Sequence, residues 1–184
     1  MHNHETRSAH KQPNLGHNSE QANKEKRFVA LSSVGAAVLL TATKTIVGLQ
    51  TNSLGILSEA AHSGLDLIAA AVTLWAVTVS SRPADEDHTY GHGKIENLSA
   101  LFETALLFLT CAWIVWEAME RLFFVDKVVE VTVWSFLVVF LSIAVDVSRT
   151  RALKLIAKRW NSQALEADAL HFESDIWSSS VVLL

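Results

Sequence analysis

The sequence predicts an all-α membrane protein, and three observations carry this prediction. Half of the 184 residues are hydrophobic and only 18% are charged, with a mean hydropathy of +0.26. Five apolar stretches hold about 20 residues or more each, enough to cross a hydrocarbon core of about 30 Å at about 1.5 Å per residue. Segment 131–145 (VTVWSFLVVFLSIAV) is apolar on all sides, which fits lipid better than water and argues against a soluble helical bundle.

Composition excludes several other classes. Fifteen Lys and Arg stand against nineteen Asp and Glu, and this net charge of −4 excludes a basic nucleic-acid-binding module. Cys111 is the single cysteine, which excludes a disulfide framework and a thiolate zinc cluster. The apolar content excludes disorder over the whole length.

The elements follow in order along the chain. Residues 1–27 are polar, lack the pattern of a secretory signal peptide, and are expected to form a disordered cytoplasmic tail. Twelve Lys and Arg lie in this tail and in the second and fourth connections, whereas the first and third connections hold two. The positive-inside rule therefore places the amino terminus in the cytoplasm, and we expect a bacterial plasma membrane. The five spans are expected at 28–49, 54–81, 97–124, 129–148 and 163–184.

The last stretch ends on SSSVVLL, with no capping glycine and no charge. We therefore expect a chain cut within the fifth helix of a six-helix bundle, so that 28–184 is an incomplete transmembrane domain. Ionisable residues interrupt the five stretches, and ten of them bear on how the helices can pack. Each costs about 2.5–3.5 kcal/mol at the centre of a membrane and must face the bundle interior or a wet cavity. They are Lys44, Glu59, Asp66, Glu103, Glu117, Glu120, Asp146, Asp168, Glu173 and Asp175.

Two of the stretches carry the same motif, His-x-x-x-Asp. It occurs as His62 with Asp66 and as His171 with Asp175. Residues four apart lie on one helix face, one turn apart, so each pair can present an imidazole nitrogen and a carboxylate oxygen to one point. Either pair alone is more simply a hydrogen-bonded pair. Two identical pairs in spanning helices predict a four-ligand N₂O₂ site, which suits tetrahedral zinc.

An acid precedes each motif by three residues, Glu59 before His62 and Asp168 before His171. These acids either line an aqueous vestibule or help to attract and relay a cation. The second connection, 82–96, contains a further cluster of Asp85, His88 and His92. This cluster is either a solvated polar loop or a three-ligand metal site with a position open to water. The four tail histidines, His2, His4, His10 and His17, are irregularly spaced, and a tail without a binding function is expected.

Three segments resemble the cation diffusion facilitator family of zinc and divalent-metal transporters. They are 53–66 (SLGILSEAAHSGLD), 82–96 (RPADEDHTYGHGKIE) and 167–175 (ADALHFESD). The resemblance implies a homodimer of six-helix protomers with a cytoplasmic carboxyl-terminal domain, exporting metal against protons. It implies a transport site of His62, Asp66, His171 and Asp175 and a loop site of Asp85, His88 and His92. The paired histidines resemble those of zinc- and cadmium-preferring members.

The expected function is therefore efflux of a divalent cation, most simply zinc, by proton-coupled antiport with alternating access. Imidazole must be neutral to bind metal, and its ordinary pKa of about 6.5 lets protons compete with the metal. No prosthetic group is expected, since the metal is cargo. Two alternatives stay open, an intramembrane zinc-dependent hydrolase and a metal sensor without flux. The hydrolase is disfavoured because the sequence lacks His-Glu-x-x-His and a spare general base.

Overall fold

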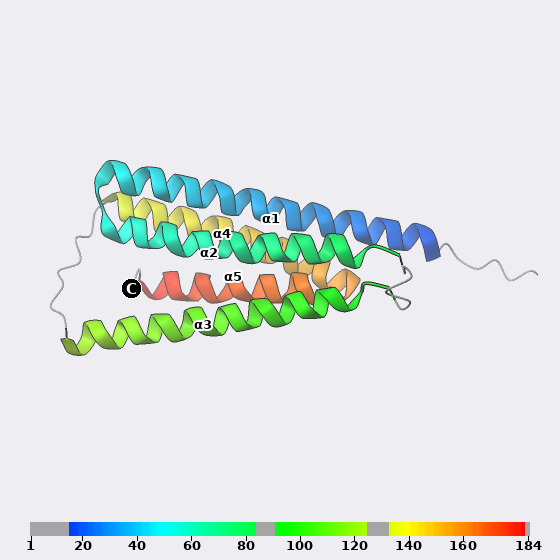
Figure 1. Cartoon of the computed structure of the whole chain (residues 1–184). Helices are drawn as coiled ribbons and strands as arrows, with labels where there is room; N and C mark the ends of the chain where they lie inside the picture. Colours follow the sequence, from blue (N-terminus) through cyan, green and yellow to red (C-terminus); the bar gives the residue numbers. More distant parts are fainter. Residues whose placement is uncertain (1–14, 84–90, 125–132, 183–184) are drawn as a thin grey trace, which may run out of the picture.

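The computed structural model describes residues 15–83, 91–124 and 133–182, and within them the regular elements are five helices. They are α1 (Leu15–Thr51), α2 (Leu54–Ser80), α3 (Lys94–Phe124), α4 (Val133–Trp160) and α5 (Gln163–Val182). The helices lie side by side along one direction (Figure 1). Helix α1 packs on α2 and α4 packs on α5, as two hairpins, and α3 lies against α2 and α5.

The all-α membrane class is confirmed. Three helices are long and apolar enough to cross a membrane, over Asn18–Thr51, Gly55–Ser80 and Lys94–Trp116. Large apolar side chains on α3 point outward, among them Phe108 and Trp116, at 78% and 76% exposed, as suits a lipid-facing surface. We expected five such spans. Helix α4 is apolar only in its first half, and α5 carries four acidic residues. Among the described residues, neither therefore has a stretch that is long and apolar enough to cross a membrane.

Two predicted boundaries were wrong. Helix α1 begins at Leu15, so the predicted disordered tail, residues 1–27, is too long. The basic stretch after Asp146 is the second half of α4 and not a connection. Both stretches are held as helix by pairing with each other. Glu25 on α1 accepts hydrogen bonds from Arg159 Nη1 at 3.1 Å and from Trp160 Nε1 at 2.9 Å on α4. Residues 1–14 of the predicted tail lie outside the described residues.

The two hairpins share the same turn. Asn52 and Asn161 adopt left-handed backbone conformations, with φ of 49° and 48°, and end α1 and α4. The next residue, Ser53 or Ser162, donates its N–H to the carbonyl of Gly48 or Ala157, at 3.1 Å in both turns. This six-to-one bond closes a helix and lets the next begin at once. A side chain at Gly48 would meet Leu57, since an added Cβ would lie 2.9 Å from Leu57 Cδ2.

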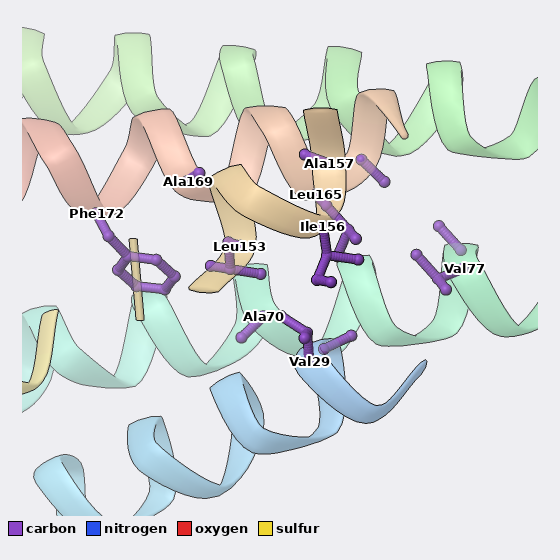
Figure 2. Close-up of a cluster of buried hydrophobic side chains, with 12 residues drawn as sticks. Val29, Ala70, Val77, Leu153, Ile156, Ala157, Leu165, Ala169 and Phe172 are labelled. Carbon is purple, nitrogen blue, oxygen red and sulfur yellow. The ribbon is translucent and has the colours of Figure 1, made fainter. Parts of the chain in front are cut away.

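The core joins the two hairpins through small and branched side chains. Figure 2 shows Val29 of α1, Ala70 of α2, Leu153 of α4 and Phe172 of α5 in one buried cluster. Alanines at the contact points bring the helix backbones close together. This close packing fixes the rotation of α2 and α5 and therefore decides which of their side chains face each other.

Candidate metal centre

The four residues predicted from the paired motifs come together between α2 and α5. His62 Nε2 lies 3.4 Å from Asp175 Oδ1, and His171 Nε2 lies 3.2 Å from Asp66 Oδ1. Within each helix the imidazole also faces its own aspartate, at 3.9 Å from His62 to Asp66 and 3.8 Å from His171 to Asp175. Each imidazole nitrogen therefore faces two carboxylates, and each carboxylate faces two imidazoles.

The register of the hairpin turns sets this meeting point. His62 lies nine residues after Ser53, and His171 lies nine residues after Ser162. At about 1.5 Å per residue, each histidine sits about 13 Å along its helix. Helices α2 and α5 run in opposite directions (Figure 1). The two histidines consequently meet near mid-length of the bundle, which is the depth at which a transport site is expected.

The four side chains of the centre are largely shielded from water, so each relies on the others for polar contacts. His171 is 1% exposed and Asp66 is 9% exposed, whereas the His62 side chain keeps 29% of its surface. Asp175 Oδ2 is buried and has no hydrogen-bond partner among the described residues. One donor atom each from His62, Asp66 and Asp175 lies within 4.8 Å of the others, close enough for one cation to bridge them. An imidazole nitrogen and carboxylate oxygens at this spacing suit a divalent ion.

The two upstream acids have different surroundings. Glu59 is half-exposed and pairs with Lys44 of α1, at 3.3 Å from Nζ to Oε2. Asp168 is fully buried and accepts a hydrogen bond from Ser33 of α1 at 3.4 Å. The aqueous-vestibule interpretation therefore fits Glu59 better than Asp168.

Sequence reasoning missed Arg149, which the structure places beside Asp168. Its guanidinium donates to Ser33 Oγ at 2.9 Å and to Asp146 Oδ1 at 3.3 Å, and it lies 3.6 Å above the Phe172 ring. Arg149 is 7% exposed, and its position directly after the apolar stretch 129–148 was the one sign in the sequence that it could lie in the helix. The sequence alone predicts that Arg149 lies in the fourth connection.

The loop cluster is only partly described. Asp85 and His88 lie outside the described residues, and His92 is buried just before α3 begins at Lys94. The structure therefore does not test whether these three residues meet.

Comparison with known proteins identifies the family of the chain. A model of the cation efflux transmembrane domain matches residues 30–184, which include all four residues of the centre. The chain belongs to the cation diffusion facilitator family. An uncharacterized transporter of Methanocaldococcus jannaschii is 39% identical over 154 residues, 84% of this chain and 54% of that protein. The cation-efflux pump FieF of Shewanella oneidensis is 32% identical over 161 residues, 86% of this chain and 53% of the pump.

A second uncharacterized transporter, from Synechocystis, is 32% identical over 158 residues, 86% of this chain and 51% of that protein. The chain thus spans about half the length of the curated relatives it matches. Their names describe transporters and efflux pumps. Together with the apolar helices, membership of the family makes this an integral membrane protein of the cation diffusion facilitator type.

Proposed function

We propose that the protein exports a divalent metal cation, with zinc as the preferred cargo, through the centre formed by His62, Asp66, His171 and Asp175. The observation that carries this proposal is the cross-pairing of two imidazoles with two carboxylates at mid-length of an apolar bundle. Two carboxylates offset the two charges of Zn²⁺, so the loaded site is formally neutral and tolerable at low dielectric. Imidazole favours zinc over harder ions such as manganese.

Coupling to protons follows from the same geometry. An ionised carboxylate can only accept hydrogen bonds, so a nitrogen 3.2–3.4 Å from it either carries a proton or shares a cation with it. Metal binding needs the bare nitrogen. Proton and metal therefore compete for the same position on each imidazole, and this competition supplies antiport without a separate proton path.

The remaining sequence predictions complete the proposal. The amino terminus faces the cytoplasm of a bacterial cell, the intact protein works as a homodimer, and Asp85, His88 and His92 form a second metal site at the cytoplasmic face. A zinc titration of the intact protein tests the loop site. We expect two bound ions per protomer and one in the His88→Ala variant, and an unchanged stoichiometry would contradict a site there.

Zinc flux into proteoliposomes tests the transport proposal. With a proton gradient imposed, His62→Ala and His171→Ala should each abolish zinc uptake. Glu173→Gln is the matched control, since Glu173 lies on α5 as well but pairs with Lys154 at the surface. It should transport at the wild-type rate. Proton-coupled zinc flux retained in both histidine variants would overturn the proposal, and zinc binding without any flux in the wild type would indicate a sensor.

A further inference from the structure

The two hairpins repeat one sequence pattern. Adding 109 to a residue number in α1–α2 gives its counterpart in α4–α5, without a gap. Between 33–66 and 142–175, eight positions are identical, and Glu59 matches Asp168. The identical pairs are Ser33 and Ser142, Val38 and Val147, Thr41 and Thr150, Asn52 and Asn161, Ser53 and Ser162, Ala60 and Ala169, His62 and His171, and Asp66 and Asp175.

The backbone follows the same correspondence. The N–H of Ser53 donates to Gly48 and that of Leu57 donates to Ser53, at 3.1 and 3.0 Å. The counterparts 109 residues later make the same two bonds, from Ser162 to Ala157 and from Glu166 to Ser162, each at 3.1 Å. The first turn lies at one end of the bundle and the second at the other (Figure 1). The hairpins are therefore inverted repeats.

The contacts within the metal centre follow the same correspondence. Swapping each residue for its counterpart turns the contact from His62 to Asp175, at 3.4 Å, into that from His171 to Asp66, at 3.2 Å. The contacts within each helix, at 3.9 and 3.8 Å, also exchange. A local two-fold axis across the bundle thus passes through the centre, the arrangement found in transporters built from inverted repeats.

The surroundings break this symmetry, because the charged residues Lys44, Asp146 and Arg149 match the apolar residues Leu153, Ala37 and Leu40. The difference is clearest at the two acids. Ser33 of α1 donates to Asp168 of α5 and accepts from Arg149 of α4, so it bridges the two hairpins on the Asp168 side. Glu59, the counterpart of Asp168, pairs only with Lys44 of its own hairpin among the described residues, and its side chain is 45% exposed. Ser142, the counterpart of Ser33, donates to Val138 of its own helix at 2.9 Å.

We propose that Glu59 and Asp168 are equivalent gate acids on opposite faces of the metal centre, and that Ser33 and Ser142 take turns in closing them. In the present conformation Ser33 holds the Asp168 face closed. In the opposite conformation Ser142 bridges from α4 to Glu59 and closes that face, while the bridge from Ser33 to Asp168 opens. Both serines are positioning residues, because they act on the acids and do not bind the cargo. This inference rests on the proposed transport function.

Paired serine variants test the exchange in the intact protein. A Cys111→Ala background removes the native thiol, and Ile56→Cys or Leu165→Cys then reports on each face. These two positions are counterparts, each three residues before its gate acid, and they are 3% and 0% exposed. Ser33→Ala should raise labelling of the Leu165 position by a soluble thiol reagent about fivefold and lower that of the Ile56 position, as expected for one lost hydrogen bond.

Ser142→Ala should produce the opposite shift of similar size. A serine with a merely structural role would lower stability without moving the two reporters in opposite directions. Unchanged labelling in Ser142→Ala, or shifts of the same sign in both variants, would overturn the proposal. Labelling is measured without metal, and zinc affinity is measured separately by calorimetry. Neither serine is a ligand, so both variants should bind zinc as the parent does. If the parent protein bound no zinc, the proposed transport function would be contradicted. The labelling, which is measured without metal, would still test the exchange between the two serines.

Discussion

Two of the clusters of buried carboxylates between the helices differ in what neutralises their charge. The first is the proposed metal centre of His62, Asp66, His171 and Asp175. The second, the Glu96 cluster, comprises Glu96 of α3 with Lys26, Ser80 and Ser162. Glu96 Oε1 accepts from Lys26 Nζ at 2.9 Å and from Ser80 Oγ at 2.8 Å, and Oε2 accepts from Ser162 Oγ at 2.5 Å. This carboxylate has three donors of its own, and one of them is a cation.

In the metal centre, by contrast, the two aspartates pair only with imidazoles among the described residues, and Asp175 Oδ2 has no hydrogen-bond partner there. A buried charge without its counter-charge is costly. In the Glu96 cluster, Lys26 neutralises the buried carboxylate. The cluster therefore holds the ends of α1, α2, α3 and α5 together. The metal centre leaves the cost to be met by protons or a cation. A cation within the cluster therefore distinguishes Glu96 from the aspartates of the proposed metal centre.

The largest expected effect removes one charge from the metal centre. Asp66→Asn and Asp175→Asn should each weaken zinc binding about 100-fold or more, because the loaded site then keeps an excess positive charge in a low dielectric. The two losses should agree within about threefold, since the residues are counterparts. Calorimetry measures both. Glu96→Gln removes one negative charge from the Glu96 cluster and should bind zinc as the wild type does. Weakened zinc binding in this variant would contradict the distinction between the Glu96 cluster and the metal centre.

The second effect concerns protons at the same centre. Zinc affinity should fall on acidification, because protons occupy the imidazole nitrogens that bind the metal. Each displaced proton contributes about tenfold per pH unit, and we expect up to two in the wild type and one fewer in His62→Ala. Affinity measured across pH gives the slope. A slope that does not change in His62→Ala would assign the proton to another group.

The fold class and the four residues of the centre were predictable because their signals are local. Apolar length indicates a spanning helix, and His-x-x-x-Asp places both groups on one face whatever lies opposite. The bridge from Ser33 to Asp168 was not predictable, since it depends on which helices touch and on their rotation. The sequence treats Glu59 and Asp168 alike, and only packing shows one exposed and the other sealed.

One signal was present in the sequence and went unused. An Asn-Ser pair precedes each histidine by the same distance, at 52–53 and at 161–162, and this shared register predicts equal depth along two helices. The start of α1 was missed for a different reason. Its polar first turns bind α4 through Glu25 and α3 through Lys26, and such long-range pairs leave no local pattern.

The third prediction tests the Glu96 cluster itself. Glu96→Gln should lower the free energy of unfolding by about 1–3 kcal/mol, because Lys26 loses its buried counter-charge and two hydroxyls lose a charged acceptor. Chemical denaturation in detergent measures this change. The aspartate variants of the metal centre should unfold no more easily than the wild type in a chelator, since these aspartates have no fixed cation whose pairing would be lost. If Glu96→Gln unfolds normally and transport is lost, Glu96 belongs to the transport path.

The smallest effect concerns an ion pair of the same chemistry at the surface. Lys154 and Glu173 pair across α4 and α5, and their side chains are 44% and 40% exposed. Water and salt screen such a pair, so Lys154→Met should change the free energy of unfolding by less than about 0.5 kcal/mol and leave zinc flux intact. Measured beside Glu96→Gln, this variant separates the effect of burial from that of charge pairing. A loss as large as that of Glu96→Gln would mean that pairing alone, without burial, fastens the helices.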